Sequence, residues 1–595
     1  MIFSYLFEVK SIQAYLFRSG KLKDVIAASE RLGNLIDTSD SCTLYQVLQN
    51  ANIQSDLLKP DEESSAERIQ FLRCKGGSFY AYCQQKEPLV KLRSLWTLTV
   101  QQLFPSLEFV DALTEADKLS EAINLGHREL AADRNAPLIK FPLATAIADR
   151  YARTGAVAVP ISKLAKHASM NEKSDESKEN ILDLDTELHR QAYQSLDMRG
   201  SAALQDRFTP DALKGQFSYP INLDKDFQYS APDVSANNKD AIKDIALIHI
   251  DGNGLGILLM GLKEVLQNRS DEEYRQGFRN FSDSLSKATE EAAKIATKWL
   301  YEVSAYQHKA EGDNEKRTYL PMRPIVLGGD DVTLLCRADL ALEYSKRFCK
   351  AFKETSQKHL KSLYEKHLKD SSLKPYLTAS GGILFHKASH PFTHSHHLVE
   401  DLCQLAKRLT KSVVRSAQEV GPAALAFHRL SNAVSDSFDA IKQRSQQFIV
   451  QDNQKSFPLD LGQNAFFVDT EETAIADIKS LERLVELCRT KTAPVSMAKW
   501  RQIATHLSLG NKTEADRIYN RSIERCKDNN ELKVFNSLFK QIAGQNAGDN
   551  QWYWRLDGSD NYQTIISDML IVDHFRPVIQ QIEPSPRVDT TTEAN

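Results

Sequence analysis

Residues 325–335 read IVLGGDDVTLL, and this stretch decides how the chain is interpreted. Apolar residues flank the Gly328-Gly329-Asp330-Asp331 turn on both sides, which predicts two buried β-strands joined by a tight turn. Two adjacent carboxylates at the tip of a sheet are costly unless cations neutralise them, and a pair of carboxylate-bound Mg²⁺ or Mn²⁺ ions is typical of nucleotidyl transfer. The glycines would let a phosphate-bearing ligand approach the backbone. Taken alone, the motif is also compatible with an ordinary exposed hairpin turn.

A third carboxylate is found where a two-metal site needs one. Residues 244–256 read DIALIHIDGNGLG, a β-branched and apolar run that ends in Asp251 and a glycine-rich turn. An acidic residue at the end of a buried strand, above such a turn, is a candidate metal ligand beside a phosphate cradle. A strand that simply ends in a turn explains this segment equally well by itself. Together the two motifs favour a metal–nucleotide site, with Asn253, Gly254 and Gly256 as nucleotide contacts.

The segments around these motifs predict a ferredoxin-like order of elements. Apolar residues three and four apart from Tyr274 to Trp299 predict a long amphipathic helix. A second helix is predicted from about Ala338 to His367, followed by the strand YLTASGGILF at residues 376–385. In the resulting order β-α-β-β-α-β, the first and third strands are central neighbours. Asp251 is therefore expected to meet the Gly-Gly-Asp-Asp turn at one edge of the sheet.

The next segment predicts a further helix. Pro391 is expected to prevent regular helix until His396 or His397, after which leucines follow at helical spacing. Lys407 and Lys411 lie one turn apart and could direct a cation at a triphosphate, although for Lys411 we favour a solvated basic face. A group of histidines matches no zinc spacing, and we interpret it as a loop beside the nucleotide pocket; its members are His386, His390, His394, His396 and His397.

With these motifs the chain resembles the large polymerase-like subunit of type III CRISPR effector complexes, which carries two palm domains related to nucleotide cyclases. In that family the palm with the Gly-Gly-Asp-Asp turn polymerises ATP into cyclic oligoadenylate messengers. The matching residues are Asp251-Gly-Asn-Gly-Leu-Gly, the Gly-Gly-Asp-Asp turn, Ser380-Gly-Gly, the His386 to Pro391 stretch and the helix ending in Ala406-Lys407.

The resemblance implies a role for each matched residue. Asp251 and Asp330 would hold two Mg²⁺ or Mn²⁺ ions with help from Asp331, and these three acids are the predicted catalytic residues. Ser380 would lie by the bound nucleotide and Lys407 by its phosphates. The full set of predicted nucleotide contacts is Asn253, Gly254, Gly256, Gly328, Gly329, Ser380, Gly381 and Lys407.

The beginning of the chain resembles the first palm of the same family. Residues 5–35 look like its opening, and residues 71–83, FLRCKGGSFYAYC, would be the corresponding hairpin, a degenerate internal repeat of the later module. Gly76-Gly77-Ser78 replaces the acidic turn, while Glu8 matches Asp251 in position. One carboxylate is too few for two metals, so we interpret this palm as structural or as one wall of a nucleotide pocket.

The predicted fold is therefore α+β, with two ferredoxin-like palm domains, the first degenerate, and a C-terminal helical bundle. Amphipathic segments beyond about residue 470 indicate the bundle. We expect a first palm-like domain at 1–150, a linker or insertion with a mobile acidic segment at 151–240, the second palm at 241–450, and a helical domain with a disordered tail at 451–595. Because the first palm begins at residue 1, no DNA-cleaving nuclease domain is expected.

Composition places the 595-residue chain among ordinary globular proteins, with 42% hydrophobic and 26% charged residues. A net charge of −4 gives no overall basic field that would recruit nucleic acid. Eight cysteines without a Cys-x-x-Cys pair favour buried free thiols over disulfides or zinc. No signal peptide and no apolar run near the ~20 residues of a membrane span are found, so a cytoplasmic protein is predicted.

The sequence is compatible with three functions. The leading hypothesis is a nucleotidyltransferase that converts ATP into cyclic or linear oligoadenylate signals in antiviral defence, with other CRISPR effector subunits and guide or target RNA as candidate partners. The second is a diguanylate-cyclase-like enzyme that uses GTP, although such enzymes usually carry Glu at the position of Asp331. The third is a catalytically silent scaffold of an RNA-guided complex, which the presence of all three acids disfavours.

Overall fold

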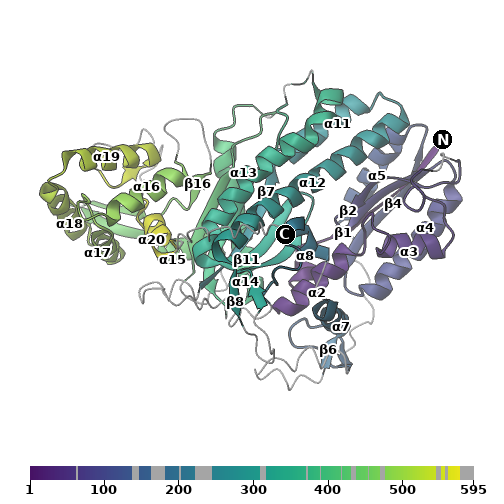
Figure 1. Ribbon diagram of the computed structural model, residues 1–595, viewed down its shortest axis with the longest axis horizontal. Helices are drawn as coiled ribbons and strands as arrows, with labels where there is room; N and C mark the ends of the chain where they lie inside the picture. Colours follow the sequence, from purple (N-terminus) through teal and green to yellow (C-terminus); the bar gives the residue numbers. More distant parts are fainter. Residues whose placement is uncertain are drawn as a thin grey trace, which may run out of the picture.

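Three parts of the molecule lie side by side along its longest axis in the computed structural model (Figure 1). They are an N-terminal α/β unit, a central unit with a larger sheet and a C-terminal unit (Figure 1). The structure describes residues 1–61, 65–136, 147–162, 181–199, 203–220, 244–308, 317–369, 371, 373–388, 390–416, 418–430, 437–452, 455–468, 476–543, 551–556 and 561–576.

The N-terminal unit is built on a four-stranded antiparallel sheet in the order β2-β3-β1-β4. Because side chains alternate across a strand, the central strand β1 feeds two cores: Phe7 packs on Trp96 of α4, and Leu6 packs beneath Gly126 of α5. The strands are β1 (Ile2–Lys10), β2 (Gln70–Lys75), β3 (Ser78–Cys83) and β4 (Glu108–Ala116), and the helices are α1 (Ile12–Leu16), α2 (Leu22–Gly33), α3 (Thr43–Asn50), α4 (Lys86–Leu103) and α5 (Leu119–Asp133).

The central unit repeats this strand order in a larger sheet, β10-β11-β7-β12-β13-β16. Its first four strands have the same neighbours as the N-terminal sheet, so the ferredoxin-like order predicted for both units is confirmed. Strands β13 and β16 extend the sheet beyond it. The strands are β7 (Asp244–Asn253), β10 (Met322–Leu327), β11 (Asp331–Arg337), β12 (Thr378–Lys387), β13 (Ala424–Arg429) and β16 (Ala465–Phe467), and the helices are α11 (Leu255–Leu266), α12 (Asp271–Ser304), α13 (Ala338–Leu363, continued by a π-helical turn, Tyr364–Leu368) and α14 (Phe392–Ser412).

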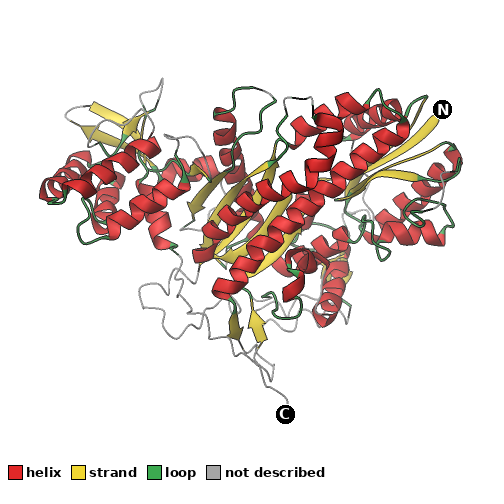
Figure 2. Ribbon diagram, turned by 45° about the horizontal axis from the view of Figure 1, so that its top comes forward, coloured by secondary structure: helices red, strands yellow, loops and turns green. Residues whose placement is uncertain are grey.

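Helix α12 joins the two sheets. A capping box between Ser270 and Glu273 starts it, and its buried residues recur at the spacing that the sequence predicts. It packs on α13 of its own unit and on β2 of the N-terminal unit (Figures 1 and 2). At this contact the buried Asp56 accepts hydrogen bonds from Arg275 Nη1 at 3.2 Å and Arg279 Nη1 at 2.7 Å. A buried carboxylate held by two guanidinium groups fixes the N-terminal unit against α12.

The C-terminal unit contains helices α16 (Ile478–Arg489), α17 (Met497–Ser508) and α18 (Lys512–Arg525) in the predicted amphipathic segments, followed by α19 (Asn529–Ala543), which was not predicted individually. A small four-stranded sheet that the sequence analysis did not predict accompanies them, in the order β14-β15-β18-β17. The strands of this sheet are β14 (Gln447–Asp452), β15 (Lys455–Asp460), β17 (Trp554–Arg555) and β18 (Tyr562–Gln563), and the remaining helices of the unit are α15 (Phe438–Ser445) and α20 (Ile566–His574).

The segment between the two palm-like units is described in pieces. Helices α7 (Leu184–Arg199) and α8 (Ala203–Phe208) pack on α2, and the short strands β5 (Ala158–Pro160) and β6 (Ile181–Asp183) form a two-stranded sheet. A second two-stranded sheet, of β8 (Tyr306–His308) and β9 (Arg317–Tyr319), belongs to the central unit, where it follows α12 in the chain. Of the predicted linker or insertion at 151–240, residues 163–180, 200–202 and 221–240 lie outside the described residues, and so do residues 577–595, where the tail was predicted.

The predicted start of helix α14 is wrong. The helix begins at Phe392, directly after Pro391, rather than at His396 or His397. Proline lacks only an N–H group that the first turn of a helix does not use, so it precedes the helix instead of delaying it. His394, His396 and His397 therefore lie on a helix and not in a loop.

Two simpler expectations concern thiols and membranes. All eight cysteines are free and all but Cys526 are buried, as predicted. Within the described part of the chain, no helix combines the length and apolar character needed to cross a bilayer.

Close packing of α14 on β12 gives a stability prediction. A Cβ at Gly382 would collide with Val399 O and lie 2.8 Å from Cys403 N, both backbone atoms of α14 that cannot rotate away. Gly382→Ala should lower the free energy of unfolding by about 1–3 kcal/mol, measured by urea denaturation. Gly256→Ala is the matched control because a Cβ there meets nothing within 4 Å. Equal stability of both variants would contradict this packing.

Candidate active site

Strand pairing brings the predicted acids together at one edge of the central sheet. Asp331 at the start of β11 is the cross-strand partner of Asp251 on β7, and Ser380 on β12 is the partner of Asp251 on the other side. Asp330 precedes Asp331 in the turn, and its carbonyl accepts a hydrogen bond from the Gly252 N–H at 3.1 Å. Three carboxylates from two neighbouring strands thus share one small region, as the sequence predicted.

Glycine is required where the two acidic segments touch. A Cβ on Gly252 would lie 2.9 Å from the Asp330 Cβ. Gly254, at the start of α11, has φ +87°, in the left-handed region that glycine tolerates best. The glycine-rich turn therefore lets the acidic turn approach β7 closely.

Crowding of negative charge perturbs Asp330. Burial raises the pKa of Asp330 to about 7, and the neighbouring Asp251 and Asp331 carboxylates act in the same direction, while Lys407 and Arg73 oppose them. The three acids are therefore not fully neutralised by the protein itself. Such a group gains strongly from binding additional positive charge.

Lys407 provides part of the neutralisation. Its Nζ lies 2.5 Å from Asp251 Oδ2 and 3.5 Å from the Gly252 carbonyl. The sequence predicted this lysine beside phosphates. In the structure its partner is a carboxylate of the acid group itself.

His249 is a site residue that sequence reasoning missed. Its Nδ1 lies 3.0 Å from Thr333 Oγ1 and 3.2 Å from Asp331 Oδ1. Burial works against protonation of this ring, but Asp331, with smaller contributions from Asp251 and Glu400, raises the pKa of His249 above its ordinary value. The available signal was a polar residue two positions before Asp251 in an apolar strand, because residues i and i+2 share a face.

The predicted contact Ser380 lies in a buried polar network. Its Oγ accepts a hydrogen bond from Asn253 Nδ2 at 2.8 Å and lies 3.0 Å from Thr410 Oγ1, and its side chain is inaccessible to solvent. Asn253 Nδ2 also donates to Thr378 Oγ1 at 3.2 Å. Ser380 thus orients Asn253. The neighbouring Gly381 is needed for packing, since a Cβ there would lie 2.7 Å from Ile250 Cγ1.

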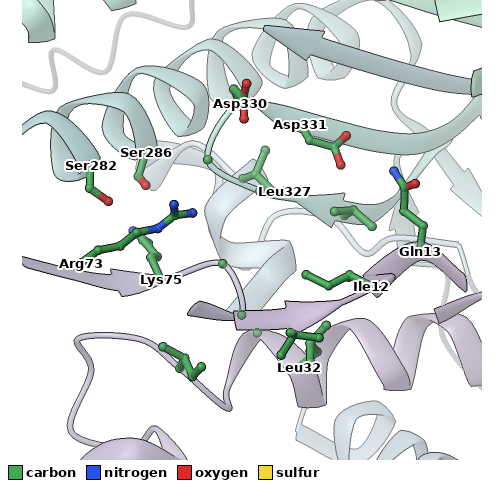
Figure 3. A pocket seen from close by; sticks show the side chains of 18 of the residues that line it. Ile12, Gln13, Leu32, Arg73, Lys75, Ser282, Ser286, Leu327, Asp330 and Asp331 are labelled. Carbon is green, nitrogen blue, oxygen red and sulfur yellow. The ribbon is translucent and has the colours of Figure 1, made fainter. Parts of the chain in front are cut away.

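Two cavities flank the acids. A cavity of about 1100 Å³ is lined by Gly328, Gly329, Asp330 and Asp331 from one side and by the N-terminal unit from the other (Figure 3). A smaller cavity of about 520 Å³ on the other side of the glycine-rich turn is lined by residues that include Asn253, Gly254, Lys407, Lys411 and Arg415. Lys411, for which a solvated face was favoured, therefore lies on a cavity wall together with Lys407.

The N-terminal unit repeats the geometry without the chemistry. Glu8 on β1 is the cross-strand partner of Ser78, as Asp251 is of Asp331. The Glu8 carboxylate accepts a hydrogen bond from the Tyr80 hydroxyl. It is therefore already satisfied by a protein donor, and Gly77-Ser78 offers it no carboxylate partner.

The side chains at this site are of the kind that bind divalent cations, but in the structure they are not grouped closely enough to hold one. Within the described residues, no three His, Cys, Asp or Glu side chains are close enough together to hold a metal ion, and this includes the histidine group. Asp331 Oδ1, however, is buried without a well-formed hydrogen bond. Carboxylate oxygens are the ligands that Mg²⁺ and Mn²⁺ prefer, and three of them at one sheet edge match that chemistry. Asp251, Asp330 and Asp331 are the residues that would hold such ions.

Comparison with known proteins identifies the central unit. Residues 244–414 match the family model of the second palm domain of Cas10/Cmr2. The resemblance inferred from the motifs is confirmed for this segment. No curated protein matches the sequence.

Solved structures of Csm1 match the chain at low identity. Csm1 of T. onnurineus is 12% identical with a TM-score of 0.38, over 97% of this chain and 70% of that chain. A Csm1–Csm4 cassette in complex with cA3 is 11% identical with a TM-score of 0.36, over 68% of this chain and 53% of that chain. A cassette with one ATP is 12% identical with a TM-score of 0.37 and the same coverage. The chain thus spans about half the length of these cassette chains.

The raised pKa of Asp330 predicts how stability depends on pH. The folded state keeps this proton up to about pH 7, whereas the unfolded chain loses it near pH 4, so wild-type stability falls as pH rises through this window. Asn at position 330 has no proton to lose, so Asp330→Asn avoids this decrease in the free energy of unfolding, which is at most about 1.4 kcal/mol per pH unit. In EDTA, urea unfolding should show a larger stabilisation by the variant at pH 8 than at pH 5.

The exposed Glu264→Gln on α11 serves as the control for this measurement and should show no such difference. An equal effect of Asp330→Asn at both pH values would mean that Asp330 titrates like an ordinary surface carboxylate.

Proposed function

We propose that this chain, whose residues 244–414 form a palm domain of the Cas10/Cmr2 type, is a nucleotidyltransferase that joins ATP molecules into cyclic or linear oligoadenylate signals in type III CRISPR-like antiviral defence. The observation that carries the proposal is the pairing of Asp331 with Asp251, together with the position of Asp330 and Asp331 on the wall of a cavity shared by two palm units. Acids in this arrangement are the usual apparatus for nucleotidyl transfer.

The reaction has a simple balance. The 3′ hydroxyl of one nucleotide loses its proton to solvent and its oxygen attacks the α-phosphorus of another, so that a new P–O bond forms while the bond from the α-phosphorus to the bridging oxygen breaks and pyrophosphate leaves. Two Mg²⁺ or Mn²⁺ ions held by Asp251, Asp330 and Asp331 would make the hydroxyl more acidic and neutralise charge on the transferred phosphate.

The residues of the chain have separate tasks in this scheme. Lys407, now paired with Asp251, stands between the acids and the smaller cavity, where it can meet the phosphates of a donor nucleotide. Asn253 is fixed by Ser380 and Thr378 on the wall of that cavity and can orient the same nucleotide. The larger cavity has about 1100 Å³, more than a single small-ligand pocket of about 300–1,000 Å³, so it can admit a second nucleotide.

Substrate and partners are assigned by the family resemblance and are tested directly. Purified protein is incubated with each nucleoside triphosphate and Mg²⁺ or Mn²⁺, with and without candidate RNA and effector subunits, and the products are identified by mass spectrometry. Oligoadenylate products support the proposal. Products from GTP alone would favour the diguanylate-cyclase-like alternative, and the absence of any product under all conditions would favour a silent scaffold.

Removal of both turn acids should abolish synthesis. Asp330→Ala with Asp331→Ala removes two of the three predicted metal ligands, and a loss of several kcal/mol of charge stabilisation corresponds to roughly 10³-fold or more in rate. Product yield is measured by mass spectrometry, with thermal unfolding to confirm the fold. The single control Glu264→Ala should retain activity, and full activity of the double variant would eliminate this site.

The two palms allow a matched comparison of equivalent acids. Asp251→Asn should reduce product yield about as severely as loss of the turn acids, because it removes the ligand from the neighbouring strand. Glu8→Gln changes the equivalent position of the N-terminal palm, where the carboxylate is held by Tyr80, and should be far milder. Equal losses at saturating ATP, with both folds intact, would show that the N-terminal palm is also catalytic.

A further inference from the structure

The hairpin of the N-terminal palm lacks the two acids and carries two basic residues on its first strand. Strand register shows the correspondence: Arg73 pairs with Tyr80 in the N-terminal palm as Val326 pairs with Thr333 in the second palm. Lys75 lies two residues further along β2, opposite Ser78. The hairpin that lacks the two acids thus has two cations on its edge strand. Residues i and i+2 of a strand point to the same side, so Arg73 and Lys75 share one face.

Helix α12 places two hydroxyl groups against these cations. Ser282 and Ser286 lie four residues apart, one helical turn, and both line the larger cavity. Figure 3 shows Arg73, Lys75, Ser282 and Ser286 gathered on one side of this cavity, apart from Asp330 and Asp331. A site with two cations and two hydroxyls matches the charge and the acceptor oxygens of a phosphate group.

Among the described residues, none of these groups is fixed by a short ion pair. Lys75 Nζ is 3.7 Å from Glu290 Oε1, which Arg207 Nε approaches more closely at 2.8 Å. Arg73 interacts with the Tyr80 hydroxyl, its Cζ lies 5.8 Å from the centre of the Tyr80 ring, and within the described part of the chain no carboxylate forms an ion pair with it. The structure gives neither Ser282 nor Ser286 a hydrogen-bond partner among the residues that it describes. The four side chains line the cavity, and a phosphate would compete there only with a neutral hydroxyl for Arg73 and with a long ion pair for Lys75.

We propose that Arg73, Lys75, Ser282 and Ser286 form an anion site, contributed by both palms, that binds the 5′-phosphates of the acceptor nucleotide or growing oligonucleotide. The proposal deepens the proposed function and rests on it. The reacting 3′ oxygen of the acceptor must lie at the acids, and its 5′-phosphates must then extend away from them. Cations at a separate part of the same cavity attract those phosphates, whereas the carboxylates repel them.

Direct binding provides the first test. In EDTA, wild-type protein is titrated calorimetrically with ATP, inorganic tripolyphosphate and adenosine, and so are Arg73→Gln/Lys75→Gln and Ser282→Ala/Ser286→Ala. The charge variant should weaken ATP and tripolyphosphate by roughly tenfold or more and leave adenosine unchanged. The exposed Lys86→Gln on the same palm is the control and should bind like wild type. Unchanged tripolyphosphate affinity in the charge variant would overturn the site.

A second test separates this site from the proposed function. The Asp330→Ala/Asp331→Ala protein should still bind tripolyphosphate, because the anion site does not use those acids. Active protein is given two diadenylate acceptors, one with a triphosphate at its 5′ end and one without any terminal phosphate. Arg73→Gln/Lys75→Gln should raise KM several-fold for the triphosphorylated acceptor and leave KM unchanged for the other.

The outcomes of this second test are distinct. An equal change in KM for both acceptors would overturn the assignment to terminal phosphates. Tripolyphosphate binding through Arg73 and Lys75 in a protein that makes no product would instead retain the anion site and reject the nucleotidyltransferase.

Discussion

The cross-strand pair Asp251–Asp331, with Asp330 beside it, is the constraint on which the site depends. Pairing of β7 with β11 fixes these carboxylates close together, and the sheet cannot separate them without losing its register. Their mutual repulsion destabilises the folded state. The protein reduces this repulsion by placing Lys407 against Asp251 and His249 beside Asp331. Among the described residues Asp330 has no cation as close as these, and its raised pKa shows where neutralisation is incomplete.

The two palms share one strand order but carry side chains of opposite charge on their hairpins. Both sheets place the hairpin strand beside the central strand in the same register, so backbone geometry does not distinguish them. What differs is the set of side chains: one hairpin has two acids, and the other has Gly77-Ser78 with Arg73 and Lys75 on the neighbouring strand. Since the hairpins line a common cavity, the fold presents charge of both signs to one ligand.

Periodicity and short motifs were sufficient to predict the strand order, helices α12 and α13 and the meeting of the three acids. They were insufficient wherever a side chain's role depends on a distant partner. Lys407 lies 156 residues from Asp251, and His249 is indistinguishable from a core residue until β11 pairs beside it. Ser380 carries a family motif, yet only the pairing of β12 with β7 shows that it acts through Asn253. The start of α14 was misplaced because Pro391 was given the effect of an interior proline, whereas its position before the first turn is compatible with the helix.

The contact between the palms matters as much as the acids, because opposite charges act on one ligand only at a fixed separation. Asp56 sets this contact: it is bound by Arg275 and Arg279 of α12 and also accepts the Phe71 N–H of β2, two residues before Arg73. Burial raises the pKa of Asp56, and the two arginines act against that shift. One buried carboxylate therefore ties the strand that carries the cations to the helix that carries Ser282 and Ser286. The anion-binding groups are thus positioned by the same ion pairs that hold the two sheets together, so their geometry is set by the fold and not by an exposed loop.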